Sequence, residues 1–198
     1  MAVALFKPHN PDHGIARGRH PLRRPAVFLA GVGGLYIFTS IVLAVAGAVP
    51  TAPVLSGMST VNYYVWQALF ILPLVFTVWV LASGVLLALG KKGCRRSAVL
   101  GETAWAWGGP LLVAWIPAFV QAAFMVLGMG QEEWVGILSE PGPWQTAYIA
   151  FFAAAAVLAV RDFILAARTV HKKSWPEAIL TGVAAAAVAV GAFVLFIR

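Results

Sequence analysis

Five long apolar runs, separated by short polar segments, constrain this chain more than any other feature of its sequence. A helix needs about 20 apolar residues to cross the hydrocarbon core of a bilayer. The runs of sufficient length are 26–49, 63–89, 98–129, 144–168 and 175–197. With 61% hydrophobic and 11% charged residues, the composition differs from that of a soluble domain. We therefore predict an all-α integral membrane protein, with a polar basic tail over 1–25 and a bundle of five transmembrane helices over 26–198.

Basic residues occur only in alternate loops, which predicts an orientation. The tail, the segment after the second run and the end of the fourth run hold thirteen of the fourteen Lys and Arg residues, and Arg198 is the exception. The loops PTAPVLSGMST and GQEEWVGILSEPGP hold none. The positive-inside rule then places the N-terminus in the cytoplasm and the C-terminus outside. We expect a bacterial inner (cytoplasmic) membrane.

The formal net charge of +7 predicts a partner for these loops. Because the basic residues flank apolar runs, that partner is anionic phospholipid headgroups, and no nucleic acid is expected. The first apolar run lacks the short core and cleavage site of a signal peptide, so we expect it to stay in the membrane as an anchor.

The third run is longer than one span requires. It contains GGP at 108–110 and a second proline at Pro117. Proline removes a helical hydrogen bond and bends or breaks a helix. From the sequence, this run is either one bent helix or a broken one, and both readings stay open.

Three of the charged residues inside the apolar runs are expected near the same edge of the membrane. Arg161 and Asp162 come about 17 residues after Trp144, which is close to 26 Å along a helix. Glu102 is four residues past Ala98 and enters from the same side. Although they belong to different helices, these residues are expected to share one depth.

Two interpretations of these charges differ in function. We favour an interhelical tie between Glu102 and either Arg161 or Arg168, with Asp162 balancing the local charge. Ionisable residues within a span also mark functional sites. The alternative is therefore a cytoplasm-facing polar pocket that binds a headgroup, an ion or a proton.

Catalytic, cofactor and metal motifs are lacking in the sequence, so we predict a non-enzymatic protein without a cofactor. The histidines lie in the tail or, for His171, in a cytoplasmic loop, so no pair is placed to ligate haem inside the bilayer. Cys94 is the only cysteine and permits no intrachain disulfide. It is either an inert thiol, which we favour, or a site of reversible palmitoylation.

From about residue 61 onward the chain resembles the Yip family, the five-span Ypt-interacting proteins and their bacterial relatives. The resemblance rests on the basic turn LGKKGCRRSAVLG, on prolines in the third run, and on FILAARTVHKKSWPEAIL at the end of the fourth. The matching positions include Gly101, Pro117, Arg168 and His171. The resemblance implies a five-span fold and a membrane role. Lys172 replaces the glycine usual in the family, and the short tail lacks the motifs of eukaryotic members, so their binding of Rab-type GTPases is not carried over.

Taken together, these features predict a non-catalytic scaffold or accessory subunit of a membrane protein assembly, with other integral membrane subunits as partners. The small residues of the fourth and fifth runs suit close helix packing, within the bundle or against a partner. The alternative function is a small-solute or ion permease that uses a broken third span and Glu102.

Overall fold

The structure is a computed structural model that describes residues 22–50, 62–90 and 93–197, the side chains of 196 and 197 excepted. This part of the chain is entirely helical and contains six helices and no strand. They are α1 (Arg23–Val45), α2 (Tyr63–Leu89), α3 (Arg96–Val126), α4 (Gln131–Ser139), α5 (Pro143–His171) and α6 (Trp175–Ile197).

Five of these helices are long and apolar enough to cross a membrane: α1, α2, α3, α5 and α6. Their bounds agree with the predicted runs to within four residues. The largest difference is at α1, which ends at Val45 because the chain turns at Gly47, where φ is 71°. That φ lies in the left-handed region, which glycine enters without steric penalty. The length and composition of these helices support an integral membrane protein.

The third span is one continuous helix. α3 runs from Arg96 to Val126 with Pro110 and Pro117 inside it, and both prolines are buried. A membrane helix tolerates proline where neighbouring helices cover the affected turn. The structure therefore resolves the two readings of this run in favour of a single helix.

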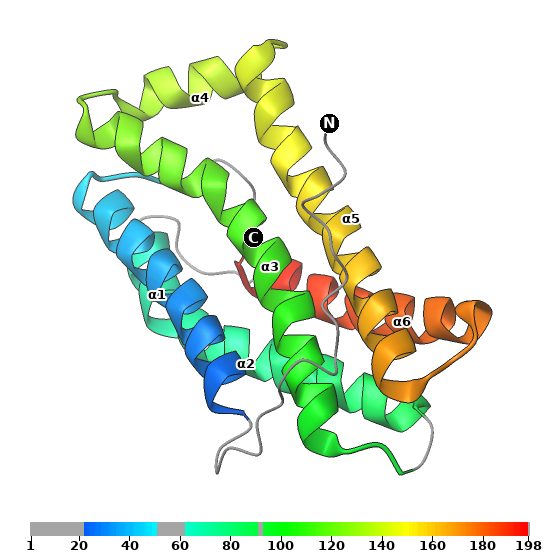
Figure 1. Cartoon of the computed structure of the whole chain (residues 1–198). Helices are drawn as coiled ribbons and strands as arrows, with labels where there is room; N and C mark the ends of the chain where they lie inside the picture. The colour runs from blue at the N-terminus through cyan, green and yellow to red at the C-terminus, as the bar shows by residue number, and fades with distance from the viewer. Residues whose placement is uncertain (1–21, 51–61, 91–92, 198) are drawn as a thin grey trace, which may run out of the picture.

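The short helix α4 was not predicted, because its sequence was read as a loop. Glu132 and Glu133 occupy its first turn, where the partial positive charge of a helix N-terminus favours carboxylates. Trp134, only 2% exposed, packs its ring against Phe124 of α3 at 6.0 Å between centroids. At 9 residues α4 is too short to span a bilayer. It joins α3 to α5 across one end of the molecule (Figure 1).

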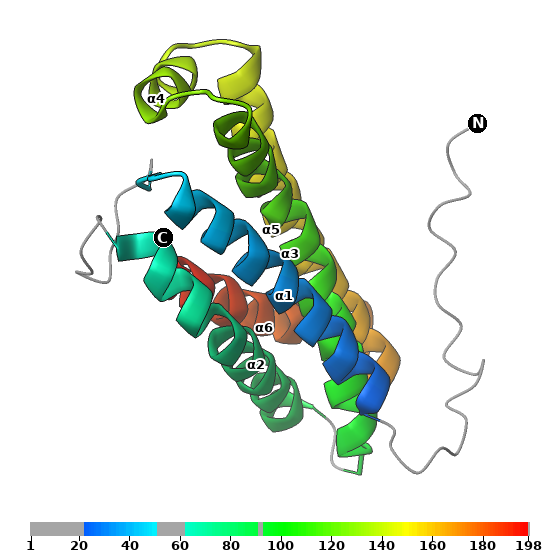
Figure 2. The same cartoon turned by 90° about the vertical axis from the view of Figure 1, so that its left-hand side faces the viewer.

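The five long helices form a closed ring. Each packs against the next in the order α1, α2, α6, α5, α3, and α3 returns to α1. α2 also contacts α3 across the ring. α5 and α6 meet near the turn between them and diverge towards their other ends (Figure 1). Figure 2 shows α4 beyond the ends of α3 and α5, away from the other helices.

Small residues permit the close approach of α5 and α6. Gly182 is buried against the backbone of Ile164, so that a β-carbon at this position would collide with the N and Cα atoms of Ile164. Ala178, Ala185 and Ala189 of α6 are each 0% exposed. Lipid supplies no hydrophobic force between helices, so packing between backbones that approach closely has to hold them together. These four small residues of α6 therefore serve packing within the chain.

Candidate functional site

The basic residues in the described loops and in the first turns of α1 and α3 gather at one end of the ring, which we call the basic end. They are Arg23, Arg24, Arg95, Arg96, Lys172 and Lys173. α1, α3 and α6 begin there, while α2 and α5 end there. The other end, which α4 crosses, is called the opposite end. The alternation of loop charges in the sequence thus corresponds to two chemically different ends of the molecule.

The charged residues singled out from the sequence lie on α3 and α5 towards the basic end. Arg161 Nε and Asp162 Oδ1 of α5 are 3.9 Å apart, and both side chains are partly exposed. Arg168 places its guanidinium over the ring of Trp175, 3.9 Å from the ring centroid. Glu102 is half-buried on α3. A tie between Glu102 and an arginine stays a prediction, whereas the contact of Arg168 with an indole was not foreseen.

His171 is a helical, buried residue, and its placement in a loop was wrong. α5 continues to His171, and the chain turns at Lys172, which has the left-handed φ of 47°. The imidazole is 3% exposed and lies so close to Gly90, at the end of α2, that a β-carbon there would overlap the ring. His171 therefore joins the end of α2 to the end of α5.

The thiol of Cys94 takes part in the same junction. His171 Nδ1 is 3.1 Å from Cys94 Sγ. The thiol also donates a hydrogen bond to the carbonyl oxygen of Val170, with 3.4 Å between sulfur and oxygen. Cys94 is half-buried. These contacts give the thiol a packing role, which favours the inert interpretation over acylation.

Lys173 adds a second link at the basic end. Its Nζ donates hydrogen bonds of 2.6 Å to the carbonyl oxygen of Leu89 and to Thr181 Oγ1. Leu89 is the last residue of α2, and a helix leaves its last carbonyl groups without partners inside the helix. The ammonium group therefore gives the last carbonyl group of α2 a hydrogen-bond partner and connects the end of α2 to α6.

A pair of buried hydroxyl groups lies between α2 and α3, further from the basic end. Ser83 Oγ and Thr103 Oγ1 are 2.5 Å apart, between α2 and α3, and both side chains are almost fully buried. Nearby, Trp79 Nε1 donates to the carbonyl oxygen of Leu100 at 2.8 Å. These hydrogen bonds connect α2 to α3 across the ring.

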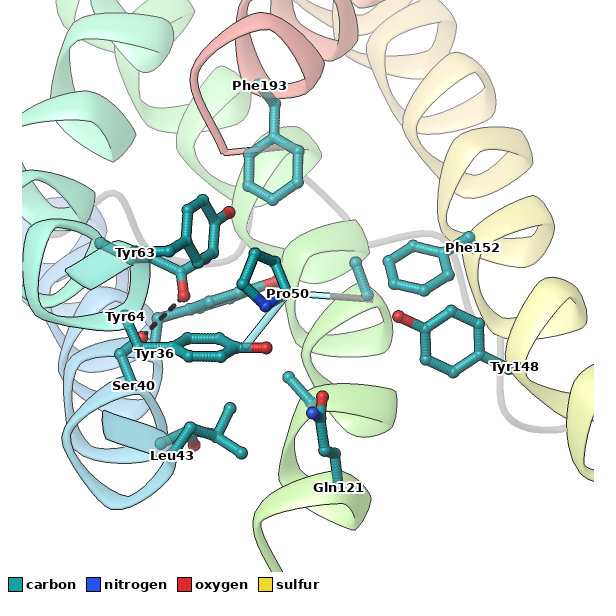
Figure 3. Close-up of a pocket in the computed structure, with 14 residues that line it drawn as sticks. Tyr36, Ser40, Leu43, Pro50, Tyr63, Tyr64, Gln121, Tyr148, Phe152 and Phe193 are labelled. Atoms are coloured by element: carbon teal, nitrogen blue, oxygen red, sulfur yellow. Dashed lines mark hydrogen bonds between the residues drawn. The ribbon is translucent and has the colours of Figure 1, made fainter. Parts of the chain in front are cut away.

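The interior opens again towards the opposite end, where all five long helices line a cavity of about 80 Å³ (Figure 3). Figure 3 shows Tyr36 and Tyr64 on one side of it and Tyr148 and Phe152 of α5 on the other. Eight of the fourteen lining residues carry a hydroxyl or amide group, and none of these fourteen is charged. The cavity is thus neutral, with polar groups set in a mainly apolar lining.

Three hydrogen bonds fix the wall of this cavity. The Tyr36 hydroxyl of α1 donates to the carbonyl oxygen of Leu111 at 2.9 Å. Trp115 Nε1 of α3 donates to Thr39 Oγ1 at 2.8 Å. In addition, the Ser40 hydroxyl donates to Gln67 Oε1 of α2 at 3.0 Å. α1 is therefore tied to both α2 and α3, so the wall is held in place by polar contacts.

A groove of about 190 Å³ adjoins the cavity, between α3, α5 and α6. The two spaces share Ala114, Phe152 and Phe193 in their linings. The other groove residues are apolar apart from the indole nitrogen of Trp107, and three of them are alanines of α5. The groove lies where α5 and α6 diverge (Figure 1).

Two buried nitrogens beside these spaces have no hydrogen-bond partner among the described residues. They are Gln121 Nε2 on the lining of the cavity and Trp107 Nε1 on the lining of the groove. Both side chains are at most 3% exposed. Buried donors without partners are uncommon in folded proteins. The sequence analysis missed Gln121, although a lone amide inside an apolar run is a visible sign of a polar interior.

The chain matches no family model, no curated protein and no solved structure. The resemblance to the Yip family therefore stays a prediction from the sequence. At its quoted positions, a β-carbon placed on Gly101 would lie 4.0 Å from Pro25 Cγ of α1, Pro117 is buried within α3, and His171 joins α2 to α5.

Proposed function

We propose that this chain is a non-catalytic accessory subunit that assembles side by side with other integral membrane proteins. The observation that carries the proposal is the outward face of α1. Ala30, Gly31 and Gly34 are exposed there, and apart from the adjoining turns of α1 itself no described atom lies within 4 Å of a β-carbon placed on either glycine.

Nothing in the described part of the chain explains glycine at these positions. In a helix, glycine costs about 1 kcal/mol relative to alanine. In a membrane, small residues one turn apart let the backbone of a second helix approach closely, as in the small-xxx-small pattern that Ala30 and Gly34 match. By contrast, Gly182 of α6 already contacts Ile164 within the chain. The proposed occupant of the α1 face is a transmembrane helix of a different membrane subunit.

One of the two arguments for the permease alternative no longer holds. It relied on a broken third span and on Glu102, but α3 is continuous. The neutral cavity is lined by Gln121, five residues before the end of α3, whereas Glu102 lies near its start. We therefore retain the accessory role as the proposal.

The proposal is tested by purifying the full chain from its native membranes in a mild detergent and quantifying bound proteins by mass spectrometry. We expect one or more integral membrane subunits at fixed stoichiometry. Replacing Gly31 and Gly34 together with leucine should reduce their recovery at least tenfold, because the side chains hold the partner backbone away.

Gly84→Leu is the matched control, since Gly84 is also exposed on a long helix with no atom near its β-carbon position. It should leave the recovery of the partner unchanged. A chain that purifies alone, or only with further copies of itself, contradicts the accessory role. Equal loss of the partner in the α1 variant and in Gly84→Leu contradicts the assignment to α1.

A further inference from the structure

We infer that the cavity and the adjoining groove form one binding site for a neutral lipid, with a carbonyl-bearing head in the cavity and an apolar chain in the groove. This inference does not depend on the accessory role, because it concerns the interior of the chain and not its outward faces. It rests on the charge, hydrogen bonding, shape and access of the site.

The lining selects against a charged head. No charged side chain belongs to the described lining of either space. Burying a phosphate or an ammonium group without a paired charge costs far more than burying a neutral polar group. Ordinary phospholipid headgroups therefore do not fit the interior, although they suit the basic end.

The unpartnered donor of the cavity indicates what the head offers. Gln121 Nε2 lines the cavity, can donate a hydrogen bond and has no acceptor among the described residues. A buried donor without an acceptor destabilises the folded chain. A carbonyl oxygen on the ligand supplies that acceptor without adding charge. Acyl esters, as in diacylglycerol, and isoprenoid quinones share this chemistry.

The groove provides the second half of an amphiphile site. Its lining is apolar apart from the Trp107 nitrogen, and it continues from the cavity past Phe152 and Phe193. Ala156 and Val194 line it and are also exposed, so it opens on the side of the helix bundle. A lipid can therefore enter laterally, with its chain in contact with the surrounding bilayer.

The size of the groove depends on alanine. Ala155, Ala156 and Ala159 of α5 line it, and a larger side chain at the exposed Ala156 would occupy the space. By comparison, Ala154 is exposed on the same helix but does not line the groove. This pair offers a filling variant and a matched control.

The experiment uses the full chain purified in detergent from native membranes, followed by solvent extraction and quantification of diacylglycerol and quinone by mass spectrometry. We expect about one of these lipids per wild-type chain. Ala156→Phe and Gln121→Leu should each lower that ratio at least fivefold, and Ala154→Phe should leave it unchanged. Predominance of diacylglycerol or of quinone identifies the source of the carbonyl.

A second measurement needs no variant. Dioleoylglycerol, decylubiquinone or phosphatidylglycerol is added to delipidated wild-type chain, and the temperature of unfolding is recorded. Saturable stabilisation by one of the two neutral lipids, and not by the anionic phospholipid, supports the site. The inference is overturned if neither neutral lipid stabilises the chain, if phosphatidylglycerol acts equally well, or if the co-purified ratio is the same in all variants.

Discussion

The two ends of the helix ring differ in how their helices are held together. At the basic end, α2, α5 and α6 meet through contacts that leave no spare volume, such as Gly182 against Ile164 and Gly90 against His171. At the opposite end, the same helices surround a cavity, and polar side chains rather than close backbone contacts connect α1 to its neighbours. The helices therefore pack more closely at the basic end than at the opposite end.

The difference follows from the distribution of small residues and polar groups. Close approach in lipid requires side chains small enough for backbones to touch, and these lie where α5 meets α6. Large polar side chains, among them Tyr64 and Gln121, occupy the opposite end and keep the helices apart. We expect substitutions at the basic end to affect stability most, whereas those at the opposite end should affect ligand binding.

The largest effect is expected for Gly182→Ala. The added β-carbon meets backbone atoms of Ile164, which cannot rotate away, so α5 and α6 must separate. Overpacking of this kind costs about 3 kcal/mol or more. The measurement is the free energy of unfolding in mixed micelles. Gly191→Ala in the same helix has no neighbour within 4 Å and should be neutral or stabilising by up to about 1 kcal/mol. Equal effects of the two changes would show that the basic end is not tightly packed.

A smaller loss, about 1–3 kcal/mol, is expected for Gly90→Ala, because the β-carbon displaces the His171 imidazole instead of a backbone. His171→Ala in the same chain should recover part of that loss by freeing the space, which a double-mutant cycle measures. Gly84→Ala, with no neighbour within 4 Å, is the control on α2. Additive effects of the Gly90 and His171 substitutions would contradict the junction.

The smallest effect is expected at the rim of the opposite end. Gln131 of α4 exchanges two hydrogen bonds with the backbone of Val49, at 3.4 Å and 3.1 Å, and both are exposed. Water can replace them, so Gln131→Ala should change the free energy of unfolding by less than about 0.5 kcal/mol. A loss above about 1 kcal/mol in the same micelle assay would show that α4 helps to hold the opposite end closed.

The extent to which the sequence predicted this molecule depends on the range of the interaction concerned. The bounds of the five long helices were predicted to within four residues. The length of an apolar run is a local property of the sequence, and the thickness of the bilayer sets the length that a spanning helix needs. α4 was missed because a helix of 9 residues with two glutamates resembles a polar loop when only hydropathy is considered.

The candidate residues were predicted less completely. Glu102, Arg161 and Asp162 attracted attention as charges in apolar runs, whereas the polar contacts that His171, Cys94 and Lys173 make at the basic end were not predicted. These last three residues sit in or beside loops, where polar residues are ordinary, and only the tertiary contacts distinguish them. Likewise, the cavity has no motif, since its lining comes from all five long helices.

By itself the sequence determined the all-helical class, the number of helices long and apolar enough to cross a membrane, and the separation of basic from non-basic loops, because hydropathy and charge act on each segment independently. The tertiary structure alone decided that α3 is continuous, that His171 is buried against Gly90, and that a neutral cavity lies among the helices. Each of these three features depends on which helices are neighbours in the bundle. In lipid the pairing of helices follows from the fit of side chains against backbones and not from hydrophobicity.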